Sequence, residues 1–105
     1  MRQRRRHLRF RVHQHVWCSD DTRTFYVRVG DASLGGLFVR APGIEVGRRL
    51  RVCFESPDGE RVDVATEAVW SGHEARGRLG VGLKILGFGA GADTYERFVR
   101  AAATV

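Results

Sequence analysis

Two short groups of polar residues have the types and spacing needed to bind an anionic ligand. The first is the arginine pair Arg5 and Arg9, and the second is the stretch from Asp31 to Gly36, with the sequence Asp-Ala-Ser-Leu-Gly-Gly. A guanidinium presents a planar fork of N–H donors that suits bidentate contacts with phosphate and stacking on bases. Asp and Ser make short-range hydrogen bonds in turns, and glycine lets the backbone adopt a positive φ or approach a ligand closely. Arg5 and Arg9 can therefore reach around one anionic ligand if their segment wraps across the body of the domain. The stretch from Asp31 to Gly36, taken alone, indicates only a polar turn between two strands.

The order of these groups, Arg-x-x-x-Arg followed by Asp-x-Ser-x-x-Gly, resembles the two-part signature of PilZ domains. In that family the two parts together bind the bacterial second messenger cyclic di-GMP. The resemblance implies that Arg5 and Arg9 hold the phosphates and guanine edges of the ligand. It also implies that Asp31 contacts guanine donors, that Ser33 contacts polar ligand atoms, and that Gly36 permits close approach.

The resemblance covers nearly the whole chain and adds residues to the expected site. It includes the run 35–39 and the glycine-containing run 80–84. Arg4 directly precedes the arginine pair, and a basic residue there resembles those in PilZ domains that accept two stacked, intercalated cyclic di-GMP molecules. The implied function is a receptor that binds the messenger, changes its N-terminal arm and surface, and signals to a separate partner protein. The expected ligand contacts are Arg4, Arg5, Arg9, Asp31, Ser33, Gly35 and Gly36.

The positive charge of the chain is concentrated at its N-terminus. The formal net charge is +6, and residues 1–12 contain six arginines and no acidic residue, so the rest of the chain is formally neutral. We define residues 1–9 as the basic arm and expect it to be flexible without a ligand.

Two alternative functions remain open at this point. One is a small basic β-barrel that binds nucleic acid through the arm, and the other is a PilZ-like adaptor with weak ligand affinity. A barrel that binds nucleic acid usually carries basic and aromatic residues across a sheet face. Here the basic excess lies in the arm, which argues against the nucleic-acid barrel. The motif of Asp31, Ser33 and Gly36 argues against both alternatives, so cyclic di-GMP is the ligand that the resemblance implies.

Alternating apolar and polar residues predict six short strands separated by turns. These strands lie at residues 10–18, 25–29, 37–40, 49–55, 62–70 and 81–85. A polar turn is expected at Asp31, a loop at 72–77 and a flexible connector at 87–91. Beyond the connector, apolar residues at helical spacing predict a C-terminal helix that begins at a capping box formed by Asp93 and Glu96.

This order of elements predicts an all-β fold with a terminal helix: a six-stranded antiparallel β-barrel followed by a C-terminal α-helix. An SH3-like or OB-like barrel would give a similar pattern, and the resemblance implies the PilZ-like form. Trp17 and Trp70 are assigned to barrel packing, with Trp70 directed inward, and a base-stacking role for either is the less favoured alternative. We expect a single domain overall, with the basic arm at 1–9 and the barrel with its helix at 10–105.

Other kinds of chemistry have little support in the sequence. No Ser-His-Asp, Cys-His or paired-carboxylate arrangement is present, so we expect no enzymatic activity and no cofactor apart from the ligand. His13 and His15 have no acid or cysteine nearby at metal-ligand spacing, so we expect no metal site. Cys18 and Cys53 lie far apart, and the sequence has neither a secretory signal nor a transmembrane run. We therefore expect reduced thiols in a cytoplasmic protein.

Overall fold

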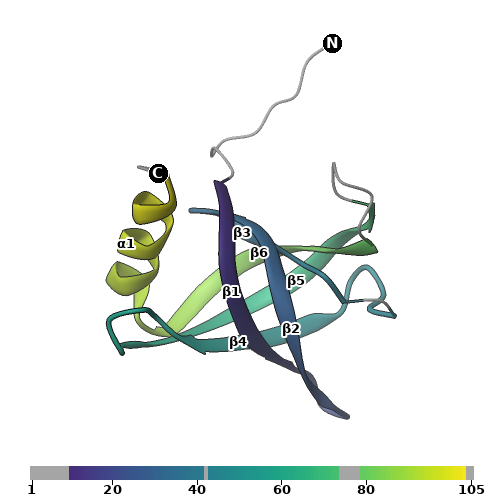
Figure 1. Ribbon diagram of the computed structural model, residues 1–105. Coiled ribbons are helices and arrows are strands. Elements are labelled where there is room, and N and C mark those ends of the chain that lie inside the picture. The colour runs from purple at the N-terminus through teal and green to yellow at the C-terminus, as the bar shows by residue number, and fades with distance from the viewer. Residues whose placement is uncertain (1–9, 42, 74–78, 104–105) are drawn as a thin grey trace.

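Six antiparallel strands close into a barrel, and one helix follows them (Figure 1). The computed structural model describes residues 10–41, 43–73 and 79–103. The strands are hydrogen-bonded in the order β1-β2-β3-β6-β5-β4, and β4 pairs with β1 to close the barrel. This architecture confirms the predicted six-stranded antiparallel barrel with a C-terminal helix. The elements are β1 (Phe10–Ser19), β2 (Thr24–Ser33), β3 (Gly36–Val39), β4 (Arg49–Glu55), β5 (Arg61–His73), β6 (Leu79–Ala90) and α1 (Ala92–Ala103).

The interior of the barrel is filled by alternate residues of the strands, because successive side chains of a strand point to opposite faces. On β1 and β4 these residues include Val12, Val16, Val52 and Phe54, each at most 6% exposed. β-Branched side chains fit such a pleated interior well, and burying each one contributes about 1.5–3 kcal/mol. All six strands contribute buried side chains to this one core.

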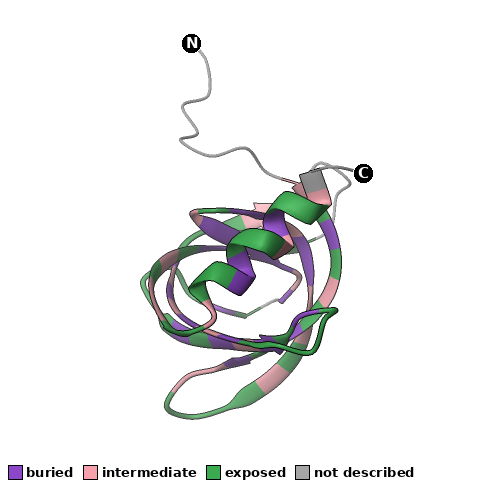
Figure 2. Cartoon of the chain, turned by 90° about the vertical axis from the view of Figure 1, so that its left-hand side faces the viewer, coloured by how far each residue is buried: buried purple, intermediate pink, exposed green. Residues whose placement is uncertain are grey.

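Helix α1 covers one open end of the barrel, which we call the helix end (Figure 2). Its inner face carries Tyr95 and Val99, which are 1% and 2% exposed and belong to the core. The ring centroid of Phe98 lies 5.2 Å from that of Phe54 on β4. The ring centroid of Tyr95 lies 5.6 Å from that of Phe88 on β6. The apolar residues at helical spacing therefore form the face that packs on the barrel.

Three strands extend beyond their predicted bounds. β2 continues through Asp31 to Ser33, so the turn that follows it is shorter than predicted and Asp31 lies in a strand. β6 continues through the predicted connector to Ala90, because this segment pairs with β5. β5 itself extends to His73, into the predicted loop. Glycine-rich sequence hides these extensions, because glycine interrupts the alternation from which strands are predicted.

The capping box predicted at Asp93 is wrong. α1 begins at Ala92, and the amide of Tyr95 donates a hydrogen bond to the carbonyl of Gly91 at 2.8 Å. Gly91 has a φ of 81°, and a Cβ there would lie 2.4 Å from the carbonyl oxygen of Arg61. The chain therefore passes from β6 into α1 at a position that requires glycine. Asp93 lies inside the first turn, where its negative charge favours the helix N-terminus.

The two cysteines are both free, as predicted. Cys18 points into the core, where burial raises the pKa of its thiol to about 12. Cys53 lies on β4, which pairs with β1, and its side chain is on the outer surface. Partial burial also raises the pKa of the Cys53 thiol. Both side chains are therefore protonated at neutral pH.

Candidate functional site

Residues 31–36, which we call the motif segment, lie at the helix end of the barrel next to the start of β1. Asp31 and Ser33 end β2, Gly36 begins β3, and a two-residue turn joins these strands. On the other side of β2, Arg11 of β1 pairs with Asp31. The basic arm is bonded to Phe10, the first residue of β1, so it joins the barrel beside the motif segment.

A row of paired residues crosses the outer surface of the barrel at Asp31. Residues that pair directly across neighbouring strands share one face of the sheet. Arg11 at one end of the row is exposed, so the row faces outward. It brings together a cation, a carboxylate and two stacked aromatic rings. This outer row consists of Arg11, Asp31, Phe38, Gly82 and Trp70, on β1, β2, β3, β6 and β5.

Trp70 lies flat against the outside of the barrel. Its ring stacks on Phe38 with the centroids 5.3 Å apart and an angle of 26° between the planes. A Cβ at Gly82 would lie 2.2 Å from the indole nitrogen, so this position requires glycine for the ring to lie there. Trp70 is 36% exposed, whereas Phe38 beneath it is 1% exposed. The prediction that Trp70 points into the barrel is therefore wrong.

The hydroxyl of Ser33 holds the turn between β2 and β3. It accepts a hydrogen bond from the amide of Gly35 at 3.2 Å and donates one to the carbonyl of Gly36 at 3.5 Å. The carbonyl of Gly35 accepts a hydrogen bond from the amide of Ile85 on β6 at 2.9 Å. Ser33 is only 5% exposed. These contacts give Ser33 a role in shaping the motif segment, and its contact with a ligand stays a prediction.

Tyr95 also reaches the motif segment, from helix α1. Its hydroxyl donates to the carbonyl of Ser33 at 2.7 Å and lies 3.2 Å from the carbonyl of Gly36. The sequence pattern predicts a core position for Tyr95 but not this contact. Helical spacing identifies the buried face of a helix, whereas the group that a hydroxyl reaches depends on how the helix packs.

Gly36 is required by strand packing rather than by backbone conformation. Neither Gly35 nor Gly36 has a positive φ. A Cβ at Gly36 would lie 2.5 Å from the carbonyl oxygen of Leu83 on β6. The close approach that Gly36 permits in this structure is therefore that of β3 to β6. Of the two roles considered for these glycines, a positive φ is therefore excluded, and close approach to a ligand stays a prediction.

The predicted ligand contacts fall into two groups. The four that the structure describes lie together in one hairpin: Asp31, Ser33, Gly35 and Gly36. The other three lie outside the described residues: Arg4, Arg5 and Arg9. Two further residues share the outer row with Asp31: Arg11, which the sequence pattern does not indicate as a site residue, and Trp70, for which barrel packing is favoured over base stacking. The alternating glycines of β6, Gly80 and Gly82, are the sequence signal that could have indicated an aromatic side chain lying across that strand.

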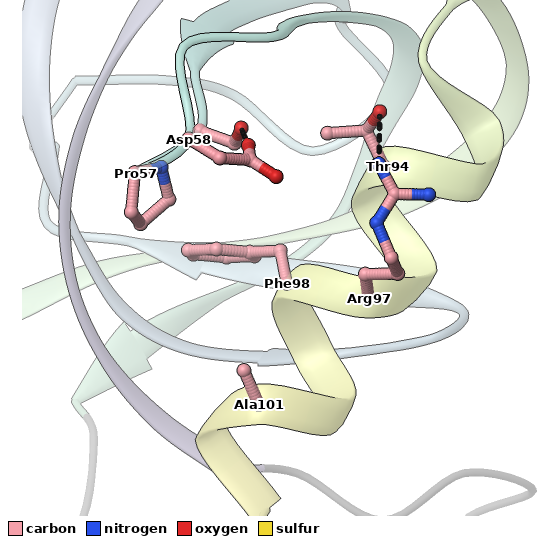
Figure 3. Close-up of a pocket in the computed structure, with 7 residues that line it drawn as sticks. Pro57, Asp58, Thr94, Arg97, Phe98 and Ala101 are labelled. Carbon is pink, nitrogen blue, oxygen red and sulfur yellow. Dashed lines mark hydrogen bonds between the residues drawn. The ribbon is translucent and has the colours of Figure 1, made fainter.

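A separate groove lies between the β4–β5 hairpin and α1 (Figure 3). Its volume is about 240 Å³, and Pro57 of the hairpin faces the ring of Phe98 across it. On its rim, Arg97 pairs with Glu60 at 3.1 Å. The groove shares no residue with the motif segment or the outer row.

The described residues meet neither the requirements of a metal site nor those of a membrane-spanning helix, and His13 contacts an arginine. Within residues 10–41, 43–73 and 79–103, no three His, Cys, Asp or Glu side chains are grouped so that they could hold a metal ion. Nδ1 of His13 lies 2.9 Å from a guanidinium nitrogen of Arg28, which must donate, so this imidazole nitrogen accepts the hydrogen bond. Among these residues, no helix has the length and apolar character to span a bilayer.

Replacing Gly36 with alanine should lower the free energy of unfolding by about 1–3 kcal/mol, because the new Cβ forces β3 and β6 apart. The matched control is Gly87→Ala on β6, where an added Cβ meets nothing within 4 Å. The control should change the stability by no more than about 0.5 kcal/mol. Urea unfolding of the two variants measures the difference, and equal stabilities would contradict this role of Gly36.

Comparison with known proteins identifies similar structures and a family. The Bacillus subtilis inhibitor of motility (MotI/DgrA) is 15% identical, with a TM-score of 0.75, and the match covers 97% of this chain and 51% of that one. The PilZ domain of Escherichia coli YcgR, solved with c-di-GMP, is 17% identical, with a TM-score of 0.67 and coverage of 97% and 93%. YcgR from Escherichia coli in complex with c-di-GMP is 18% identical, with a TM-score of 0.67 and coverage of 97% and 46%.

These likenesses show a shared fold, and this chain spans about half the length of the inhibitor of motility. No curated protein matches the sequence. The model of the PilZ domain matches residues 3–101. With the motif segment and the closed six-stranded barrel in place, this match over almost the whole length shows that the chain belongs to the PilZ domain family.

Proposed function

We propose that this chain is a receptor for cyclic di-GMP. The observation that carries the proposal is the position of Asp31, which faces outward at the end of the barrel where the basic arm begins. Membership of the PilZ family supports it, and so does the likeness to the YcgR PilZ domain, whose structure holds c-di-GMP. As a member of a family of binding domains, the chain would bind the messenger without altering it.

The outer row has the chemistry that a guanine nucleotide requires. A carboxylate accepts hydrogen bonds from N–H donors, which suits Asp31 to the donor edge of guanine. The exposed face of Trp70 offers a surface on which a base can stack. Arg11, on the other side of Asp31, is exposed and offers a charge-assisted contact to a phosphate.

The arginines of the arm are within reach of this surface. Arg9 is bonded to Phe10, and Arg5 precedes Phe10 by five residues. A chain spans at most about 3.6 Å per residue, so the Cα atom of Arg5 lies within about 18 Å of that of Phe10. We propose that Arg5 and Arg9 bind the phosphates and guanine edges from the side opposite Asp31.

Substitutions in both parts of the site should weaken binding. Arg5→Ala, Arg9→Ala and Asp31→Ala each remove hydrogen bonds that involve a charged group, which contribute about 1.5–3 kcal/mol each. Cyclic di-GMP affinity should therefore fall by about ten- to a hundredfold, as measured by calorimetry. Ser33→Ala should also weaken binding, and it should lower the stability as well because the hydroxyl holds the turn.

The matched control is Arg49→Ala. Arg49 is exposed at the end of β4 away from the helix end, and its backbone lies opposite that of Glu67 in the β4–β5 ladder. The Arg49→Ala variant should bind cyclic di-GMP with an affinity within about twofold of that of the unchanged chain. A control that loses as much affinity as the Arg5 variant would show that the site is misplaced.

We further propose that the ligand changes the state of the basic arm and the surface offered to a partner protein. Six arginines in residues 1–12 repel one another, and an anionic ligand between the arm and Asp31 offsets this repulsion. Amide hydrogen exchange across residues 2–9 should slow when cyclic di-GMP is added. Equal protection with and without the ligand would contradict the change.

The position of Arg4 leads us to propose two ligand molecules per chain. Two molecules of cyclic di-GMP bring four phosphate charges, and a third guanidinium can offset this charge and stack on a guanine face. Arg4→Leu should favour one bound ligand, because leucine cannot balance the second molecule's charge. Titration and native mass spectrometry give the stoichiometry. If the unchanged chain and Arg4→Leu both saturate at one ligand, binding of two cyclic di-GMP molecules is excluded, while the receptor assignment is unaffected.

One observation favours a second candidate function, the binding of single-stranded nucleic acid. On the outer face of β1 and β2, the ring of Tyr26 lies between His15 and Trp17, at centroid distances of 5.1 and 4.7 Å. Trp17 is 52% exposed, so its assignment to barrel packing is wrong. Exposed aromatic rings beside Arg28 match the composition of a stacking surface for bases. A single-stranded oligonucleotide in the same calorimetric series, with GTP and cyclic GMP, distinguishes this function from a cyclic di-GMP receptor.

A further inference from the structure

We propose that Tyr95 is a positioning residue for the ligand site and couples helix α1 to it. The inference rests on the proposed function, because it concerns the affinity of the motif segment for cyclic di-GMP. Tyr95 belongs to α1 and touches the motif segment from inside the barrel, on the side opposite the surface where the ligand would bind.

The hydroxyl of Tyr95 is held in a fixed position. The ring is 1% exposed and lies against Phe88 and Phe98, with centroid distances of 5.6 and 6.2 Å. Such packing leaves the ring little freedom to rotate or shift. The hydroxyl therefore has a fixed position at the helix end of the barrel. The backbone segment that accepts its hydrogen bond is consequently fixed relative to α1.

The chain that accepts this hydrogen bond is the backbone of the predicted binding motif. The hydroxyl donates to the carbonyl of Ser33 at 2.7 Å, and the carbonyl of Gly36 lies 3.2 Å away. These two carbonyls stand on either side of the turn that leads from β2 into β3. Asp31 precedes this turn by two residues on the same strand. A shift of the turn therefore moves the end of β2, and the carboxylate of Asp31 with it.

The other contacts of the turn do not replace this hydrogen bond. The hydroxyl of Ser33 belongs to the turn itself, so it can shape the turn but cannot fix it to the rest of the barrel. The amide of Ile85 fixes the turn to β6 through the carbonyl of Gly35. Tyr95 supplies the contact with α1, and the turn is thereby held between the sheet and the helix.

This arrangement makes coupling between the ligand and α1 reciprocal. If the hydrogen bond from Tyr95 favours the conformation that binds cyclic di-GMP, then bound cyclic di-GMP must favour the conformation in which the hydrogen bond forms. The ligand should consequently stabilise α1, although α1 contributes no residue to the outer row. The helix end of the barrel would then present a different surface to a partner when the messenger is bound.

The test is the variant Tyr95→Phe, which keeps the ring and removes the hydroxyl. Loss of one buried hydrogen bond should weaken cyclic di-GMP binding by about three- to tenfold in calorimetry. Tyr26→Phe is the matched control, because it removes a hydroxyl from a tyrosine that is 57% exposed on the outer face. Its affinity should match that of the unchanged chain.

A second variant separates positioning from loss of stability. Val99→Ala destabilises the packing of α1 but keeps the hydroxyl of Tyr95. At a temperature where all variants are folded, Val99→Ala should bind cyclic di-GMP more tightly than Tyr95→Phe does. Equal losses of affinity in these two variants, or none in Tyr95→Phe, would overturn the proposal.

Hydrogen exchange supplies a readout in the absence of ligand. In Tyr95→Phe the amides of Gly35 and Ile85, which hold the turn, should exchange faster than in the unchanged chain. Added cyclic di-GMP should slow exchange across α1 in the unchanged chain and less so in Tyr95→Phe. Unchanged exchange at both amides would overturn the role of Tyr95, whereas failure of the unchanged chain to bind cyclic di-GMP would overturn the proposed function itself.

Discussion

The closed barrel includes β3, a strand of only four residues, and the placement of the candidate site depends on how β3 is held between its neighbours. β3 pairs with β2 on one side and with β6 on the other along its full length. All four of its residues are buried. A register shift of one residue would turn the core-facing side chains of β3 to the opposite face, so burial fixes its register. Gly36 allows the approach to β6 at one end of β3, where a side chain would meet the carbonyl of Leu83. The motif segment is the connection into this strand, so the constraint that closes the barrel also fixes the backbone of the motif.

The inner and outer surfaces of the β2–β3 hairpin, which carries the motif segment, have different roles. Inside the barrel, Tyr95 and the apolar core contact the turn between β2 and β3 and hold it in place. Outside, Asp31 lies between Arg11 and the stacked pair of Phe38 and Trp70. An outward-facing site on a rigid sheet keeps its side chains in position before a ligand arrives, which lowers the entropic cost of binding. The arm, which carries most of the excess charge, is joined to this sheet at Phe10, the first residue of β1.

Alternation in the sequence was enough to predict six strands in a small barrel, because the inner face of the barrel is almost entirely apolar. The choice of the PilZ-like form over an SH3-like or OB-like barrel came from the motif. The outer face follows no such rule, and there the prediction failed at both tryptophans. Trp70 was assigned to the interior on its apolar character, yet it covers Gly82 on the outside. The motif itself was visible in the sequence, but the reason for Gly36 was not. That reason is a contact with β6, which lies far away along the chain and close only after the barrel has formed.

We propose that cyclic di-GMP binds over the outer row, and the two tryptophans of the chain allow this binding to be observed. Trp70 belongs to the outer row, whereas Trp17 lies on β1 beside Tyr26 and Cys53. Each indole N–H gives its own signal in a nitrogen-15 correlation spectrum, so one titration with cyclic di-GMP follows both surfaces. If the ligand lies over the outer row, the Trp70 signal should shift during the titration while the Trp17 signal stays within the spectral linewidth. A shift of the Trp17 signal with no change at Trp70 would contradict binding over the outer row.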